Sequence, residues 1–564
     1  MRRKSQLSVA VLVAVVTATV LVLAGCGSSS GSGGTDADPA SAVPATAPLY
    51  LGADVRPSGS ESSGALAAGK ALTGSPNPFP RLVSALRTPG SPRLDYARDV
   101  APWLGPHAGL FALSLGSAQA LVAPLSASLS GSGSIGPLPF AAGGLDGALV
   151  MDTRDAGAAR SFLAAQAKRA GAHSSSYRGV SYEVSPGGVA FGLVGSFAVI
   201  GSEAGLRAVI GVTQGEAALA SAAAYAKLAG SAPSGAIAHL YLSPGSGRAG
   251  TGASKGLLQA IGGSGQTYAS LVAAAGSLQL DIDTLPQPGG GEASGGLLRY
   301  DPQAAQALSE LPGESWLAIG IGHAGSSLAG TAAGLSALSS LAGKESEAGA
   351  LSLGSLVSGL TGPLRVLGAD TPAARRDYAS WMGSAGIFAA GSGVLDLRAA
   401  VVISSTDQSR SRAAVGKLAK QLRTAGYEVS KATIPGAEAA AAVRLPGVPL
   451  IVYVAAGSPP SGPKFVLGLG EPSVATALSP SSTLAGSPAR AAAASALGEG
   501  IEPSVLVDFP TLLALLEGVG LNEDPSLAPV LPYLRASSRL AGGGHPLDGG
   551  IERFRLVLAL RAAG

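Results

Sequence analysis

The residues that could form a serine hydrolase site are spread over two distant parts of the chain. The pattern G-x-S-x-G surrounds Ser254, and Asp281 or Asp283 and then His323 follow it in the order Ser, Asp, His. A nucleophile elbow needs its serine on a tight turn between a strand and a helix. Ser254 instead lies more than ten residues after the preceding strand-like run, within a Gly/Ser-rich segment, 243–256. A hydrolase is therefore only a second alternative among the functions we expect.

Glycine patterns of the nucleotide-binding type, G-x-G-x-x-G, occur three times, at Gly131/Gly133/Gly136, Gly245/Gly247/Gly250 and Gly320/Gly322/Gly325. Because 82 of the 564 residues are Gly, about one or two such matches are expected by chance. Only the third pattern follows a strand-like run. A dinucleotide site also needs an acidic residue that ends a second parallel strand about twenty residues later. Glu345 and Glu347 lie instead in a polar loop, so we predict a glycine-rich turn and no cofactor.

Histidines and paired carboxylates give no metal-site pattern. No two of the five histidines have metal-ligand spacing, so we predict no zinc site. His239 lies in an apolar strand-like run, which is typical of a core or edge histidine. Asp281 and Asp283 share one face of a predicted strand, and Asp152 and Asp155 bracket a predicted helix start. A solvated strand face and a helix cap are the favoured interpretations; calcium binding or acid–base chemistry is the alternative.

Trp103 and Trp381 follow similar segments of the chain, within Trp-Leu-Gly and Trp-Met-Gly. Large aromatic side chains in a chain with only 4% aromatic residues usually lie in the core. We therefore expect each Trp to anchor a core, and the alternative is that both contact a ligand or a partner.

The first 26 residues have the pattern of a secretory signal. Arg2, Arg3 and Lys4 precede an apolar run, Leu7–Leu23, which ends in Leu23-Ala24-Gly25-Cys26. This segment resembles a bacterial lipoprotein signal. The resemblance implies that a signal peptidase recognises Leu23, Ala24 and Gly25. It also implies that Cys26 receives a diacylglycerol and becomes the amino terminus, which can be acylated in turn, for example by palmitate.

The lipid would decide where the protein resides. Two or more acyl chains make a stable anchor without a membrane-spanning helix. No later stretch of eighteen residues is apolar and free of charge, Gly and Pro. We therefore expect an extracytoplasmic protein that is anchored to the cell membrane through Cys26. This residue is the only cysteine, which excludes a disulfide framework and a thiolate zinc cluster.

The chain after Cys26 divides into a linker and two similar halves. Residues 26–47 are rich in Gly, Ser and Pro, and we predict a flexible tether. Several segments then recur in the same order, at offsets between 252 and 282 residues. We therefore predict two domains, residues 48–300 and 301–564, that arose by duplication. The recurring pairs are Pro44 and Pro312, Leu49–Leu51 and Leu317–Ile319, Asp95–Ala97 and Asp377–Ala379, Gly109–Ala112 and Gly386–Ala389, Ala148–Met151 and Ala400–Ile403, and Phe197–Ile200 and Phe465–Leu467.

Within each half the apolar periodicity predicts both helices and strands. Val415, Leu418 and Leu422 have helical spacing, with a cap at Thr406 or Asp407 and a stop at Gly426. Runs at 448–455 and 464–469 predict a strand pair, as do 188–194 and 196–200 in the first half. Alternating strands are expected around 278–282 and 554–558. We predict an α+β fold in which each half has a largely antiparallel sheet and packed helices.

These features together resemble an uncharacterised bacterial family, domain-of-unknown-function family 3352. The resemblance rests on the lipoprotein signal, the tether, the two copies, the Trp-Leu-Gly segment and the segment Phe-Ala-Val-Ile-Gly-Ser-Glu at 197–203. It covers nearly the whole mature chain. It implies an envelope protein and supplies no activity.

Charge excludes one class of partner. The chain has 38 basic and 35 acidic residues, and three of the basic ones leave with the signal. A mature chain with balanced charge is not a nucleic-acid binder held by bulk electrostatics. We expect a non-catalytic binding or structural module of the envelope that meets an envelope protein. The alternative is a carrier of lipid or another apolar ligand, with a cavity within or between the halves.

Overall fold

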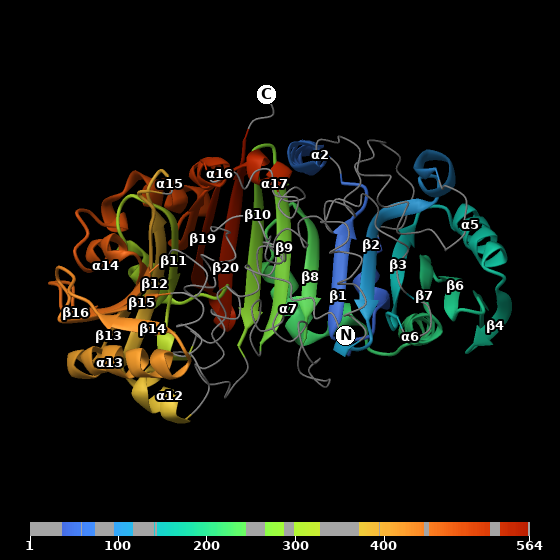
Figure 1. The fold of residues 1–564 in the computed structure, drawn as a ribbon. Coiled ribbons are helices and arrows are strands. Elements are labelled where there is room, and N and C mark those ends of the chain that lie inside the picture. Colours follow the sequence, from blue (N-terminus) through green and yellow to red (C-terminus); the bar gives the residue numbers. More distant parts are fainter. Residues whose placement is uncertain are drawn as a thin grey trace. The chain divides into compact units, whose positions relative to one another are not determined.

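The computed structural model describes residues 37–57, 59–73, 95–116, 140, 144–243, 265–286, 298–326, 372–393, 395–444, 451–518 and 531–561. Within these residues the chain forms two compact units (Figure 1). The first unit contains the described residues up to 286 and the second contains those from 298 onward. The sequence prediction put the boundary between residues 300 and 301. Leu23, Ala24, Gly25 and Cys26 lie outside the described residues, as do Ser254 and the first two glycine patterns.

The first unit is built on one antiparallel sheet, in the order β10-β9-β8-β1-β2-β3-β7-β6-β5-β4. Its strands are β1 (Leu49–Asp54), β2 (Leu104–Ala112), β3 (Gly147–Thr153), β4 (His173–Tyr177), β5 (Val180–Val184), β6 (Val189–Val194), β7 (Phe197–Ser202), β8 (Ala236–Leu242), β9 (Gln266–Ala274) and β10 (Ser277–Leu285). Its helices are η1 (Pro39–Ala42), α2 (Gly59–Thr73), η2 (Tyr96–Val100), α5 (Ala156–Arg169), α6 (Glu203–Thr213), η3 (Leu219–Ser221) and α7 (Ala223–Ser231).

The second unit has an antiparallel sheet in the order β20-β19-β18-β11-β12-β13-β17-β16-β15-β14. Its strands are β11 (Ser315–Ile321), β12 (Met382–Ala390), β13 (Arg398–Ser405), β14 (Glu428–Lys431), β15 (Ala439–Arg444), β16 (Ile451–Gly457), β17 (Lys464–Leu469), β18 (Glu502–Asp508), β19 (Ser537–Leu547) and β20 (Ile551–Leu560). Its helices are α9 (Pro302–Ser309), α12 (Pro372–Asp377), η6 (Ala379–Trp381), α13 (Gln408–Thr424), α14 (Glu471–Leu478), η7 (Leu484–Gly486), α15 (Pro488–Leu497), α16 (Phe509–Gly518), α17 (Leu531–Ala536) and η9 (Asp548–Gly550).

The two units follow one plan, strand for strand. Adding ten to each strand number of the first sheet gives the order of the second sheet. All strand pairs within each unit are antiparallel, and helices pack against them (Figure 1). The prediction of a mixed α and β fold with antiparallel sheets is confirmed. The sheet makes up more of the fold, and the helices less, than we predicted.

Helix α13 shows how local sequence builds one of these elements. The Asp407 carboxylate accepts a hydrogen bond from the Arg410 backbone N–H, which satisfies a donor of the first turn. Val415, Leu418 and Leu422 are buried on its inner face. The helix ends just before Gly426, whose φ of 92° is a conformation that favours glycine. Of the two predicted caps, Asp407 is the one observed.

The segment at 37–47 is part of the fold, so the predicted tether extends too far. Ala40, Ala42 and Val43 are completely buried, and the Asp38 carboxylate caps η1. The Leu219 backbone N–H donates to the Val43 carbonyl at 2.7 Å, which ties the segment to the chain after α6. Small apolar side chains fit close to the sheet, although their composition resembles that of a linker.

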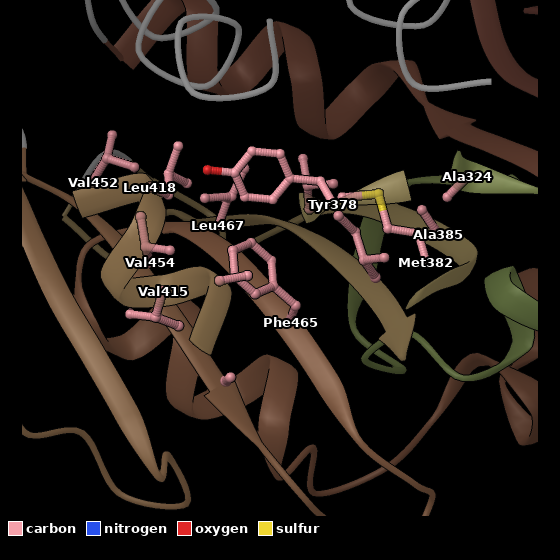
Figure 2. Close-up of a cluster of buried hydrophobic side chains, with 14 of the residues drawn as sticks. Ala324, Tyr378, Met382, Ala385, Val415, Leu418, Val452, Val454, Phe465 and Leu467 are labelled. Atoms are coloured by element: carbon pink, nitrogen blue, oxygen red, sulfur yellow. The ribbon is translucent and has the colours of Figure 1, made fainter. Parts of the chain in front are cut away.

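Each unit has a Trp at an equivalent place in its core. The indole Nε1 of Trp103 donates to the Asp99 carbonyl, and that of Trp381 donates to the Asp377 carbonyl, both at 2.9 Å. Each Trp carbonyl in turn accepts a bond from the backbone N–H of the residue after β3 or β13. In the second unit, the Trp381 ring lies 5.3 Å from the Phe465 ring, centroid to centroid. Figure 2 shows Phe465 among the side chains of this core.

The Trp contacts correct one of the predicted alignments between the halves. We paired Asp95 with Asp377 because Tyr and Ala follow both. The carbonyls that accept from the two Trp side chains instead make Asp99 the equivalent of Asp377. Their neighbours agree, because Arg98 pairs with Asp99 at 2.7 Å and Arg376 pairs with Asp377 at 3.4 Å.

Strand pairing corrects a second alignment by one residue. On equivalent strands, Asp152 is the partner of Phe197, and Ser404 is the partner of Lys464. Phe197 is therefore the equivalent of Lys464 and not of Phe465. Because successive side chains of a strand point to opposite faces, a shift of one residue exchanges the two faces. Phe465 accordingly lies in the core under α13, whereas Lys464 lies on the other face of the sheet.

We expect Trp381→Phe to lower the free energy of unfolding by about 1–3 kcal/mol, because it removes a buried hydrogen bond and leaves a cavity. Trp316→Phe is the matched control, because the Trp316 indole N–H has no hydrogen-bond partner among the described residues. Trp316→Phe should lower the free energy of unfolding clearly less than Trp381→Phe does. Urea denaturation followed by circular dichroism measures both variants, and equal losses would contradict the proposed anchoring bond.

Candidate functional site

Trp103 and Trp381 are core residues in this structure. Their exposed fractions are 1% and 0%. The Trp103 ring lies 5.0 Å from that of Phe162 on α5. Neither side chain reaches the surface, so a contact with a partner there would require the core to open. The expectation of a core anchor agrees with this burial.

The described residues of the predicted Ser, Asp, His order are divided between the two units. Asp281 and Asp283 belong to the first unit and His323 to the second. The His323 Nδ1 lies 2.8 Å from the Asp301 Oδ2, within its own unit. Asp301 also caps α9, so this pair holds the end of β11 against a helix start. Ser254, the proposed nucleophile, lies outside the described residues.

Asp281 and Asp283 are buried, which overturns the predicted solvated face. Each is 1% exposed on β10. Helix α7 packs on this side of the sheet, and its Ser231 hydroxyl donates to Asp283 at 2.7 Å. The Gln279 amide donates to Asp281 at 3.1 Å. The predicted helix cap at Asp155 is confirmed, because its carboxylate accepts from the Ala158 backbone N–H.

In the third glycine pattern, other atoms of the protein occupy the space beside two of the glycines. A Cβ on Gly320 would collide with the Ala304 carbonyl, and one on Gly322 would collide with the Asp301 carboxylate. These glycines therefore allow β11 to approach α9 closely. A carboxylate beside the turn also disfavours a bound phosphate. The arrangement agrees with the predicted glycine-rich turn.

Two negative observations concern the described residues only. They contain no group of three or more His, Cys, Asp or Glu side chains that could hold a metal ion. Among the same residues, no helix combines the length and the apolar character needed to span a membrane.

The first unit contains a buried aromatic cluster that the sequence did not reveal. We call it the tyrosine–histidine cluster, and it comprises Tyr50, Tyr225, His239, Tyr241 and Tyr268. His239 stacks on Tyr268 with ring centroids 5.1 Å apart and an interplanar angle of 12°. The Tyr225 hydroxyl lies 3.4 Å from the His239 Nε2. Tyr225 also meets Tyr50, Tyr241 and Tyr268 edge-on.

Strand register assembles this cluster from residues far apart in the chain. Tyr50, Tyr241 and Tyr268 are direct neighbours across β1, β8 and β9. The row continues on β10 with Asp283, the partner of Tyr268. An adjacent row on the same face runs from Gly52 through His239 and Ser270 to Asp281. A Cβ on Gly52 would collide with the His239 imidazole, so glycine leaves room for the ring.

The second unit has small or aliphatic residues where the first has its row of tyrosines. From the strand pairing, Ala318, Leu506 and Ala541 are the equivalents of Tyr50, Tyr241 and Tyr268. They belong to an apolar core. The plan of the fold therefore does not require polar groups at these positions.

Burial sets the protonation states in the tyrosine–histidine cluster. It lowers the pKa of His239 to about 4, while the carboxylates of Asp38 and Asp54 oppose the shift more weakly. Burial also raises the pKa of Tyr225 and of Tyr268. Near neutral pH the imidazole is uncharged and the phenols are protonated. The cluster can then exchange hydrogen bonds but carries no charge on these rings.

The second unit has a small pocket with a buried lysine, which we call the Lys464 pocket. Its polar residues are Glu310, Ser384, Ser404 and Lys464, and its other lining residues are Ala307, Leu311, Pro312, Ala385, Gly386, Val402 and Ala477. The side chain of Lys464 is only 5% exposed, and its Nζ lies 3.9 Å from the Glu310 Oε2. Burial lowers the pKa of Lys464, and the Glu310 carboxylate opposes this shift.

Comparison with known proteins identifies the family. The model of the family described as "Protein of unknown function (DUF3352)" matches residues 7–518. This match covers nearly the whole chain, and the chain belongs to that family. A search of curated proteins and a search of solved structures found no match.

His239 predicts a specific loss of stability in mild acid. Its pKa is about 6.5 when unfolded and about 4 when folded, so protonation favours the unfolded state. The neutral imidazole contributes fully to the stability of the fold above pH 6.5, and this contribution decreases as the pH falls toward 4. Between pH 7 and pH 5 the free energy of unfolding of the wild type should fall by about 2 kcal/mol more than that of His239→Gln.

Urea denaturation at the two pH values measures this difference. The control is His173→Gln, which replaces an exposed histidine on β4 and should retain the wild-type pH dependence. If His239→Gln and the wild type lost equal stability, the imidazole would not be the group that titrates.

Proposed function

We propose that this member of the DUF3352 family is an extracytoplasmic lipoprotein and a non-catalytic binding or structural module of the cell envelope. The observation that carries the proposal is the segment Leu23-Ala24-Gly25-Cys26. It follows a basic start and an apolar run, and it contains the only cysteine of the chain. A lipid on Cys26 would hold the protein at the membrane surface.

The short chain between Cys26 and the first helix supports a location of the first unit close to that surface. Only residues 27–37 separate Cys26 from Asp38, the cap of η1. Eleven residues can span at most about 40 Å even when fully extended. The lipid would therefore keep the first unit close to the membrane, where it can meet other envelope components.

Several polar groups of the described residues hold elements of the fold together. His107 lies 2.6 Å from Asp54, its partner on the neighbouring strand, and His323 lies 2.8 Å from Asp301. Asp283 accepts a bond from Ser231 on the covering helix. Each of these contacts fastens one element of the fold to another.

The common plan of the two units supports duplication followed by divergence. Strand order and the Trp contacts are shared, whereas the interior residues differ at equivalent positions. We infer that one ancestral unit was copied, and that the copies then acquired different side chains on a conserved framework. Such a pair offers two different interiors on one anchored chain, which is compatible with a binding or structural role.

Cys26→Ser tests the anchor in the native bacterium. The wild type should partition with membranes, and its amino-terminal peptide should carry the mass of a diacylglycerol. The variant should lack that mass and leave the lipid-linked fraction. Gly25→Ala is the control, because it keeps a small residue before the cysteine and should remain lipidated. An unmodified Cys26 in the wild type would overturn the proposal.

A further inference from the structure

We propose that the Lys464 pocket binds the carboxylate group of a ligand, and that Glu310 is the counter-charge of Lys464 when no ligand is bound. The inference rests on the proposed binding role and gives that role a chemical class of ligand. It concerns only the second unit, where residues of α9 and the turn after it, β12, β13, β17 and α14 line the pocket.

No described side chain takes up the N–H donors of Lys464 in a close hydrogen bond. An ammonium group has three N–H donors and is costly to bury without partners. Among the described residues, the Glu310 Oε2 lies 3.9 Å from the Lys464 Nζ, which is too far for a good hydrogen bond. The side chain is 95% buried and lines the pocket. An incoming oxygen anion could supply the missing acceptor.

The hydroxyl groups beside Lys464 add to the polar wall. Ser404 is its direct partner across β13 and β17. The Ser404 hydroxyl donates to the Ser384 carbonyl at 3.0 Å, and the two Oγ atoms lie 3.1 Å apart. Because Ser404 uses its proton in that bond, the Ser384 proton can go either to the Ser404 Oγ or to a bound oxygen. The wall therefore offers a hydroxyl donor as well as a cation.

The fold does not need a cation at this position. Phe197 occupies the equivalent place in the first unit, opposite Asp152. The equivalent strands of the first unit thus pair with an aromatic ring there. A buried charge that the framework does not require, and that lines a pocket, points to recognition of an opposite charge.

Size and shape select a carboxylate over a larger anion. The free space in the pocket is about that of one or two water molecules. The two oxygens of a carboxylate group could take the places of such waters, whereas a tetrahedral phosphate is larger and carries more oxygens. Glu310 already places a carboxylate near the ammonium, and its side chain is 38% exposed at the rim. It can move into solvent when a ligand carboxylate takes its place.

Acetate is the probe for a small organic acid, and N-acetylalanine is the probe for the carboxyl end of a peptide. The wild-type chain is kept in detergent at constant ionic strength with chloride. Either carboxylate should raise the Tm. The probe that binds more tightly shows whether the pocket prefers a small organic acid or the carboxyl end of a peptide. Phosphate should raise it no more than chloride does. A larger response to phosphate than to both carboxylates would overturn the proposal.

Two substitutions at the pocket have opposite expected effects. Lys464→Met should abolish the response to acetate, and the Phe at the equivalent position indicates that an apolar side chain is tolerated there. Glu310→Gln removes the competing carboxylate and should lower the Kd for acetate about fivefold. The matched control is Lys417→Met, which breaks an exposed pair with Asp377 and should leave the response unchanged. A higher Kd for acetate in Glu310→Gln than in the wild type would contradict the assigned role of Glu310.

Chemical protection locates the site within the chain. Reductive methylation with formaldehyde, followed by peptide mass spectrometry, gives the modification rate of each lysine. Acetate should slow the reaction of Lys464 at least threefold and leave Lys417 unchanged. Equal protection of both lysines would overturn the proposal. None of these experiments uses the lipid, so their failure would leave the assignment of Cys26 untouched.

Discussion

The pairing of β3 with β7, and of β13 with β17, is the constraint on which the interior of each unit depends. Antiparallel register decides which side chains share a face, because alternate residues point to opposite sides of the sheet. In the second unit it directs Phe465 and Leu467 toward α13 and Trp381, and it directs Lys464 toward α9. A slip of one residue would bring the ammonium group into the apolar core. The location of the pocket is therefore a consequence of strand register.

The sequence predicted those features that local patterns determine. The cap at Asp407, the apolar face of α13 and the paired Trp residues could be found because their signals lie within a few residues of one another. The tyrosine–histidine cluster could not, because Tyr50, Tyr225 and Tyr268 come together only through the order of the strands. The pairing of Phe197 with Phe465 was misleading for a related reason. In segments rich in Ala, Val and Gly, a shift of one residue changes the similarity little but exchanges the faces.

The two units show how one framework can hold different interiors. Tyrosine rings fill the space between the sheet and α7 in the first unit, whereas Ala318, Leu506 and Ala541 contribute to an aliphatic core in the second. The first interior gains hydrogen-bonding groups, at the cost of a histidine that resists protonation. The second keeps a cation on the face that opens to a pocket. The shared strand order ensures that these differences remain inside and leave the scaffold unchanged.

The partly buried segment at 37–47 has a mechanical consequence. In a chain that is held at Cys26, any pull between the membrane and the folded part reaches the protein first at η1. There the load falls on Val43 and its backbone bond to Leu219, and on the packing of Ala40 and Ala42. Strands β1 and β2 lie behind this segment in the path of force. The first unit would thus be the first part of the fold to bear such a load.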